Sequence, residues 1–395
     1  MPRLLILAPI WDFQPRNGGD IRILEISSEI AKRFDVDIVG LARNVEKVPS
    51  VFHERYLLEE KKRSVINRIR SFCDGRRPYH VNLYYSKETQ EAVQALLKTG
   101  RYGLVYSHFL YPLVYLQGAG IPVVVDQHNV DRVYWANKLK HTRTLRKGII
   151  CWNLARTIAF ESRNLEQVRA YVSVSAEDSE ITRSYACSDS REFWVVPNGV
   201  DTHRFSPQIS MPKSEILIGY LGSLDMEMNL LAVHRLIYDI WPKVVSGPGG
   251  ERFQLQIIGK NPTGDVYRWA RSTKSVEVVG EVEDVVPFLN ALDLFACPIT
   301  MGAGTKLKIV EAMACGLPVV GTPLALAGID GVHGRHFVEA TSDEDFVMAI
   351  RALADNRERR LEIGEAARSL VCEKYDWGNI GKALSENLRG LLDRK

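Results

Sequence analysis

Short apolar runs of strand length alternate with longer segments of helical periodicity along this chain. An apolar run at 4–8 is followed by a polar loop, a helix at 21–34 with apolar residues three or four positions apart, and a second apolar run at 36–41. This alternation predicts parallel sheets with helices on their faces. Further strands are expected at 104–106, 123–125, 171–174, 194–196, 216–221, 253–258, 276–279, 292–296 and 318–321.

The alternation is interrupted once, between Pro197 and Pro207. This stretch is rich in turn-forming residues, and no periodic apolar pattern resumes before Ile216. We therefore expect two α/β domains, each a doubly wound, Rossmann-like sheet, with residues 1–200 in the first and 201–375 in the second.

Composition narrows the class of protein. The 395 residues include 46% hydrophobic and 25% charged residues, as in ordinary globular proteins, and the net charge of +3 is too small to indicate nucleic acid as a partner. The six cysteines have no C-x-x-C spacing, so reduced thiols are expected. No apolar run is long enough to span a bilayer or to act as a signal peptide, so a cytoplasmic location is expected.

The segment 292–321 reads as strand, glycine-rich loop, helix and strand. Gly302 and Gly304 allow the loop to turn tightly and to approach a ligand. Thr305 is a suitable N-cap for the helix, and Gly316 followed by Pro318 predicts its end.

One face of this helix carries Lys308 and Glu311, and Lys306 lies in its first turn. A helix N-terminus beside lysines suits a diphosphate, while Glu311 would accept hydrogen bonds from a sugar hydroxyl. The alternative is a surface ion pair of little energy. The residues alone leave both interpretations open.

Two other strand exits carry candidate groups. Gly18 and Gly19 follow the first strand, where they form either an ordinary turn or a close approach to a ligand. His128 follows the strand at 123–125, beside Asp126, and is either a structural histidine or a substrate contact.

The segment from Cys297 to Val320 resembles the donor-binding motif of retaining glycosyltransferases of family 4, which have the two-domain GT-B fold. Residues 197–207 resemble the interdomain segment of that family. Tyr375-Asp-Trp377 resembles its aromatic motif, after which a last helix, here about 376–395, returns to the first domain. The resemblance implies two Rossmann-like domains that face a cleft, with the acceptor side in 1–200 and the nucleotide-sugar side in 201–375.

The resemblance also implies roles for individual residues. His128, Lys308 and Glu311 would be catalytic, with His128 facing the transferred sugar and Glu281 and Val282 facing the nucleobase. The full set implied for donor binding is Gly18, Gly19, Gly222, Ser223, Glu281, Val282, Gly302, Ala303, Gly304, Thr305 and Lys306.

The chain departs from the family pattern at three positions. Ala303 stands where many members have an acidic residue, and Ser223 and Asn229 stand about where many have basic residues that grip the diphosphate. Lys306 and Lys308 are expected to supply the missing positive charge.

The expected reaction moves a sugar from a nucleotide diphosphate-sugar to a hydroxyl of a glycan, glycolipid or small-molecule acceptor, with retention of configuration. No Asp-x-Asp metal site is evident, so neither metal nor cofactor is expected. The alternatives are a nucleotide-sugar epimerase on the same fold and a non-catalytic nucleotide-sugar-binding subunit.

Two basic stretches, 59–77 and 138–147, interleave positive and apolar residues. They are either solvated helix faces or surfaces for anionic lipid or a phosphorylated acceptor. The second interpretation predicts a peripheral contact with the inner face of the membrane.

Overall fold

The computed structural model describes residues 3–12, 18–43, 50–59, 71, 75, 77–142, 146–186, 188, 190–208, 214–301 and 305–394. The chain forms two compact units. Unit 1 comprises residues 1–197 and 381–395, and unit 2 comprises residues 198–380. Both are parallel α/β units, so the expected fold class, two Rossmann-like domains, is confirmed.

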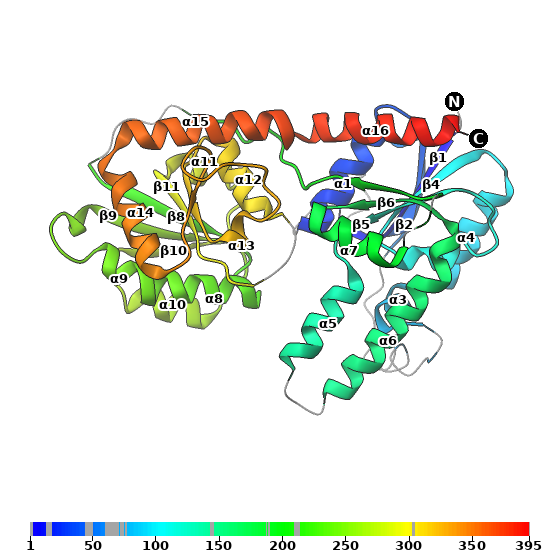
Figure 1. The fold of residues 1–395 in the computed structure, drawn as a ribbon, viewed down its shortest axis with the longest axis horizontal. Helices are drawn as coiled ribbons and strands as arrows, with labels where there is room; N and C mark the ends of the chain where they lie inside the picture. Colours follow the sequence, from blue (N-terminus) through cyan, green and yellow to red (C-terminus); the bar gives the residue numbers. More distant parts are fainter. Residues whose placement is uncertain are drawn as a thin grey trace. The chain divides into compact units, whose positions relative to one another are not determined.

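Unit 1 is built on a seven-stranded sheet in the order β3-β2-β1-β4-β5-β6-β7, in which all neighbouring strands run parallel (Figure 1). Strands β4 and β5 are buried along their whole length, as expected for a sheet covered on both faces. The strands are β1 (Arg3–Asp12), β2 (Val36–Arg43), β3 (Glu54–Glu59), β4 (Tyr102–His108), β5 (Val123–Gln127), β6 (Val168–Ser173) and β7 (Glu192–Val195).

The helices of unit 1 connect these strands, and α5 and α6 together form a long excursion between β5 and β6 (Figure 1). Ser86 caps α4 by accepting a hydrogen bond from the backbone amide of Thr89. The helices are α1 (Gly18–Ala31), α3 (Tyr79–Tyr84), α4 (Lys87–Lys98), η2 (Tyr111–Tyr115), α5 (Asp131–His141), α6 (Arg146–Asn164), η3 (Leu165–Gln167) and α7 (Ala176–Ala186).

Unit 2 is built on a six-stranded parallel sheet in the order β10-β9-β8-β11-β12-β13. Its core packs around large buried side chains that include Trp241, Phe295 and Phe346. The strands are β8 (Ile216–Leu221), β9 (Phe253–Ile258), β10 (Val276–Gly280), β11 (Leu294–Cys297), β12 (Val319–Gly321) and β13 (Val338–Glu339).

The longest helices of unit 2 come last in the chain. Ser342 opens α14 with a capping box, in which its side chain and that of Asp345 each bond to the other's backbone amide. The helices are α8 (Glu227–Arg235), η4 (Leu236–Ile240), α9 (Trp241–Val244), η5 (Gly250–Arg252), α10 (Gly264–Arg271), α11 (Val286–Ala291), α12 (Leu307–Ala314), α13 (Pro323–Leu326), α14 (Asp343–Asp355), α15 (Arg357–Lys374) and α16 (Trp377–Asp393).

Helix α16 begins in unit 2 and continues into unit 1 from Gly381. Its first turn is fixed within unit 2, because the Asp376 carboxylate accepts a hydrogen bond of 2.6 Å from the Thr202 hydroxyl. Gly381 lies against Glu29 of α1, so closely that a Cβ there would be 2.3 Å from the Cβ of Glu29. The absence of a side chain at this position lets the two helices approach each other.

One helix boundary differs from the sequence prediction. Helix α1 begins at Gly18 rather than near residue 21. Glycine has a low helix propensity, which biased the prediction toward a loop.

Candidate functional site

Each sheet has a point where the strand order reverses, and ligands of such sheets bind beyond the carboxyl ends of the strands at that point. In unit 2 the reversal lies between β8 and β11, and in unit 1 between β1 and β4. The candidates from the sequence come directly after strands at or next to these points. In unit 2, Gly222 follows β8, and the segment 302–306 lies between β11 and α12 along the chain. In unit 1, His128 follows β5, the neighbour of β4.

Lys308 of α12 is held by two groups from β8 and α8. Its Nζ donates to the hydroxyl of Tyr220 at 3.0 Å and to the side-chain oxygen of Asn229 at 2.7 Å. Asn229 is itself fixed, because its amide nitrogen donates to the carbonyl of Ser223 at 2.8 Å. Burial lowers the pKa of Lys308 to about 8. The ammonium group is therefore pre-positioned at the carboxyl end of β8 and still charged at neutral pH.

Glu311 lies one turn further along α12. Burial raises the pKa of its carboxyl group to about 7, although Arg204 and Lys308 oppose this shift. Its carboxylate has no hydrogen-bond partner in the part of the chain that the structure describes. A partly buried acceptor without a partner is suited to receive a ligand hydroxyl.

Because Gly222 has no side chain, the end of the Lys308 side chain can lie directly beside it. A Cβ at Gly222 would lie 2.7 Å from the Nζ of Lys308 and 2.9 Å from the side-chain carbon of Asn229. The Gly222 backbone also packs closely against the turn after β9, since a Cβ on Gly259 would lie 1.7 Å from the carbonyl oxygen of Gly222. The close packing of these turns positions the lysine.

The start of α12 corrects one prediction. Thr305 is not the N-cap, because the helix begins at Leu307 and Lys306 occupies the cap position without a capping side chain. The Thr305 hydroxyl instead faces Gly328, and the Thr305 carbonyl accepts a hydrogen bond from Asn198 at 3.3 Å. Gly302, Ala303 and Gly304 lie outside the described residues.

The remaining candidates of unit 2 surround this region. Lys306 is buried, and its charge contributes to lowering the pKa of Lys308. The Ser223 hydroxyl donates to Asp225 at 2.7 Å. Glu281 is exposed and Val282 partly buried, just after Gly280, which has a φ of +82°. Their role toward a nucleobase stays a prediction.

Unit 1 has a buried charged network at the end of β5. Arg22 of α1 binds the Asp126 carboxylate through Nε and Nη2, the latter at 2.8 Å, and donates through Nη1 to the carbonyl of Pro197. Burial alone would raise the pKa of Asp126, but the Arg22 guanidinium and His108 outweigh it and hold this pKa well below its usual range. The pair is therefore ionised and fixes the strand end.

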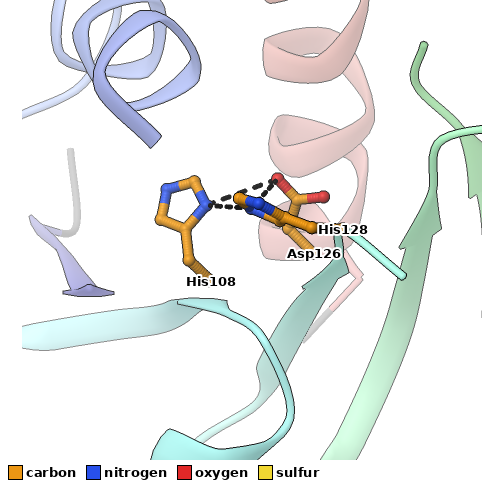
Figure 2. Close-up of side chains that lie close together, drawn as sticks. All are labelled: His108, Asp126 and His128. Carbon is orange, nitrogen blue, oxygen red and sulfur yellow. Dashed lines mark hydrogen bonds and ion pairs between the residues drawn. The ribbon is translucent and has the colours of Figure 1, made fainter. Parts of the chain in front are cut away.

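His108 and His128 share this network (Figure 2). The Nδ1 of His108 lies 3.2 Å from the Nε2 of His128 and 3.4 Å from the Oδ2 of Asp126. Burial lowers the pKa of both histidines, so both are neutral at pH 7. The other ring nitrogen of His108, Nε2, is hydrogen-bonded to the hydroxyl of Ser27 at 2.9 Å.

The charge of Asp126 favours one arrangement of the protons. The ionised carboxylate lies 3.4 Å from the Nδ1 of His108 and favours a proton there, which His108 donates to the Nε2 of His128. The proton of neutral His128 then lies on Nδ1, which is buried and has no partner among the described residues. His128 therefore presents a donor that a ligand hydroxyl would satisfy.

The residue after β4 supports this histidine. The ring of Phe109 packs against His128 with centroids 4.0 Å apart and the ring planes inclined by 35°, and the Phe109 backbone adopts a φ of +67°. A non-glycine residue in this region costs about 1 kcal/mol or more, and such strain is concentrated at functional sites. The backbone amide of Phe109 donates to the carbonyl of Asp126 at 2.8 Å, which maintains the conformation.

Gly18 and Gly19 form the first turn of α1 rather than a loop. They remain near a helix N-terminus, whose free amides suit an anion. Their role toward a diphosphate stays a prediction.

One group in the described part of the chain has ligand atoms spaced closely enough for a metal ion: His108, Asp126 and His128, whose atoms lie within 4.8 Å of one another. Its carboxylate already pairs with Arg22 and accepts from the Tyr106 hydroxyl at 3.1 Å. A cation there would face the buried guanidinium, so the residues fit a hydrogen-bond network better than a metal site.

Comparison with known families identifies both units. The family described as "Glycosyltransferase Family 4" matches residues 16–204, and "Glycosyl transferases group 1" matches residues 215–356. The chain belongs to the family 4, group 1 glycosyltransferases. Within the described residues, no helix of this family 4 chain is both long and apolar enough to cross a membrane.

Two curated relatives of this family 4 chain are each 32% identical. The lipopolysaccharide 1,2-N-acetylglucosaminetransferase of Salmonella typhimurium matches over 51% of this chain and 57% of its own length. The phosphatidyl-myo-inositol mannosyltransferase of Propionibacterium freudenreichii matches over 55% of each. The chain thus spans a little over half the length of these relatives.

Solved structures confirm the GT-B fold. Sucrose-phosphate synthase from Thermosynechococcus elongatus superposes with a TM-score of 0.72 over 100% of both chains, at 15% identity. The Anabaena protein HepE, solved in complex with UDP and glucose, superposes with a TM-score of 0.69 over 99% of this chain and 100% of its own, at 14% identity.

The structure adds residues to the predicted family 4 site. Arg22, His108 and Tyr220 were missed, and Asn229 was noted only as a missing charge, whereas it holds Lys308. Arg22 had a signal, since it stands on the inward stripe of α1 beside Ile23 and Ile26. His108 also had a signal, since it stands at the carboxyl end of β4, as His128 stands beyond β5. Tyr220 had none, because it lies inside an apolar strand.

Proposed function

We propose that this chain is a retaining glycosyltransferase that moves a hexose from a nucleotide diphosphate-sugar to an acceptor hydroxyl. The observation that carries the proposal is the pair on α12. Lys308 is fixed by Tyr220 and Asn229, and Glu311, one turn away, has no hydrogen-bond partner among the residues that the structure describes. The first suits the diphosphate and the second a sugar hydroxyl of the nucleotide.

The main demand of this reaction is stabilisation of the leaving group. The bond between the anomeric carbon and the diphosphate breaks, and the acceptor oxygen bonds to the same face of the sugar. Lys308, with its charge held in a partly buried position, would stabilise the developing charge on the diphosphate. Buried Lys306 and the N-terminal amides of α12 would add to the same field.

His128 is assigned to the sugar. Its Nδ1 proton would be donated to a hydroxyl of the transferred sugar, with Phe109 and His108 fixing the ring. A neutral histidine suits this role, because it adds no positive charge beside a developing oxocarbenium ion.

The reaction is proposed to be independent of metal. Fixed positive groups of the chain take the place of a divalent cation, and Arg22 already occupies the carboxylate of the His108, Asp126 and His128 group. Activity that survives exhaustive chelation supports this, whereas loss that added Mg²⁺ or Mn²⁺ restores contradicts it.

The acceptor is proposed to be a lipid-linked glycan or glycolipid. Support comes from the two relatives, whose names specify lipopolysaccharide and phosphatidyl-myo-inositol.

The deciding experiment is a thermal-shift panel of UDP, GDP, ADP and dTDP with their common sugars. A nucleotide that binds the folded state raises the melting temperature by mass action. We expect one base to be selected, and we expect Glu311→Ala and Lys308→Ala each to abolish the shift. Lys274→Ala is the matched control, because this exposed lysine of unit 2 lies between α10 and β10, away from α12.

No shift with any nucleotide, in protein that melts cooperatively, would contradict a donor site. A shift without sugar transfer and without slow hydrolysis of the donor would identify a binding subunit. Interconversion of the donor in the absence of acceptor would identify an epimerase.

A further inference from the structure

Helices α5 and α6 form a hairpin that projects from the sheet of unit 1 (Figure 1). It leaves after β5 and returns before β6, and the two helices pack against each other. The 19 residues of α6 alone extend about 28 Å at 1.5 Å per residue. We call residues 131–164 the hairpin.

The hairpin concentrates positive charge. It contains eight Lys or Arg and two Asp or Glu, a net charge of +6, whereas the whole chain carries +3 and the remainder therefore −3. Both acidic residues, Asp131 and Glu161, lie where the hairpin joins the sheet. Glu161 pairs there with Arg132. Between residues 133 and 160 the sequence has six basic residues and no acidic one.

The outward face of α6 is apolar instead of polar. One face of the helix is buried, through residues that include Ile150, Thr157 and Phe160. The opposite face carries Trp152, whose side chain is 40% exposed. Ile149, 49% exposed, and Ile158, 40% exposed, lie on the two flanks of this face. Exposed alanines, Ala155 and Ala159, complete it. A helix on the surface of a soluble domain normally turns polar residues outward, so this face is suited to being covered.

Aromatic and basic side chains alternate on both helices. Arg156 stacks on Trp152 with its guanidinium 4.1 Å from the ring, and Lys138 lies 5.6 Å from the ring of Tyr134, which is 52% exposed. Near the tip, Lys140 and Lys147 are exposed. Tryptophan and tyrosine beside lysine and arginine are the composition of segments that lie at the boundary between lipid headgroups and acyl chains.

We propose that the hairpin binds the surface of an anionic lipid bilayer, with Ile149, Trp152 and Ile158 inserted at the headgroup boundary and the basic residues against the lipid charges. Charge complementarity selects this occupant, since neither a neutral bilayer nor a basic protein would match a net charge of +6. The proposal is independent of the sugar that the site transfers.

The test is co-sedimentation of the full chain with vesicles of phosphatidylcholine, with and without phosphatidylglycerol. We expect binding only to the anionic vesicles, weakened by added salt. Each basic residue near the surface contributes about fivefold to the affinity. Lys138→Gln/Lys140→Gln/Lys147→Gln should therefore weaken binding roughly a hundredfold.

The matched control removes the same charge elsewhere in unit 1. Lys87→Gln/Lys98→Gln/Lys382→Gln also neutralises three exposed lysines, and we expect nearly unchanged binding. For insertion, Ile149→Ser/Trp152→Ser/Ile158→Ser should weaken binding at least tenfold. Val332→Ser/Met348→Ser/Leu361→Ser, three exposed apolar residues of unit 2, should not. All four variants need the melting temperature of the parent within a few degrees.

The two lysine triple variants distinguish an effect of where the charges lie from an effect of the net charge of the protein. Equal weakening by the hairpin and control lysine triplets would overturn the proposal, because it would show an effect of net charge alone. Binding to soluble dextran sulfate but not to anionic vesicles would also overturn it and would indicate a polyanionic carbohydrate instead.

Discussion

Lys308 and Glu311 are placed where burial opposes the charged form of each. The pKa of the lysine is lowered to about 8 and that of the carboxyl group is raised to about 7. Both are charged together mainly between these values. Because a bound diphosphate and a bound hydroxyl each favour the charged form, a ligand would relieve strain that the empty protein bears.

Glu311→Gln should therefore stabilise the empty protein while it abolishes nucleotide binding. The folded pKa lies above the unfolded value of 4.5, so ionised Glu311 costs free energy that increases between pH 4.5 and 7 and stays constant above. Because the side chain is partly exposed, we expect a gain of about 1 to 2 kcal/mol at pH 8, a few degrees in melting temperature.

The measurement is the melting temperature at pH 8 and pH 5, with Glu386→Gln, at an exposed position of α16, as the control. The advantage of Glu311→Gln should shrink by more than half at pH 5, whereas the control should show none at either pH. An advantage that is equal at both pH values would mean that Glu311 is not strained.

At the scale of elements, the site of unit 2 depends on how closely β8, α8 and α12 approach one another. Gly222 directly follows β8 and lies against the ammonium of Lys308, to which Asn229 of α8 is hydrogen-bonded. The lysine is therefore positioned by backbone packing as well as by its hydrogen bonds.

Gly222→Ala should displace Lys308 without unfolding unit 2. The added Cβ would lie 2.7 Å from the end of a flexible side chain, which can move, whereas the hydrogen bonds to Tyr220 and Asn229 cannot then both persist. We expect nucleotide affinity to fall about tenfold and the melting temperature to change by only a few degrees.

Gly264→Ala is the control for this substitution. It begins α10 in the same unit, and nothing lies within 4 Å of the added Cβ. Calorimetric titration with the selected nucleotide measures both variants. Unchanged affinity in Gly222→Ala would show that the position of Lys308 does not matter for binding.

The sequence predicted those elements whose pattern is local. The alternation of apolar runs identified both sheets, and Gly316, with a φ of +74°, ends α12 as expected. The carboxyl ends of strands pointed to His128 and Lys308 because parallel topology alone brings such ends together.

Contacts between distant segments could not be predicted in this way. Arg22 and Asp126 are 104 positions apart, and Asn229 and Lys308 are 79 apart, so neither pairing leaves a periodic signal. Thr305 failed as an N-cap for a related reason, since its hydroxyl is directed toward Gly328, a neighbour that only the fold supplies. The roles of Gly302, Ala303 and Gly304 stay predictions.

At the scale of the whole molecule, the proposed reaction divides its groups between the two units. Lys308, Lys306 and Glu311, which are assigned to the nucleotide, lie in unit 2, and the histidine assigned to the sugar lies in unit 1. Each half keeps its own buried network, Lys308 with Tyr220 and Asn229 in one, and His128 with His108 and Asp126 in the other.

Hydrogen exchange should separate these two contributions. The nucleotide alone should slow exchange in peptides that contain β8 to α8 and the start of α12. The nucleotide-sugar should additionally slow exchange in the peptide from β5 to the start of α5, which includes His128. Mass spectrometry of the apo, nucleotide-bound and nucleotide-sugar-bound protein measures both, and protection of the β5 peptide by the nucleotide alone would contradict this division.

The charge of the hairpin has a further consequence for the protein in solution. With +6 on one projection and −3 on the rest of the chain, each molecule is an electric dipole as well as a weak cation. At low ionic strength the positive projection of one molecule is attracted to the negative remainder of another. Dissolved salt, which screens that attraction, would therefore keep the purified protein dispersed, although the same salt would loosen it from a bilayer.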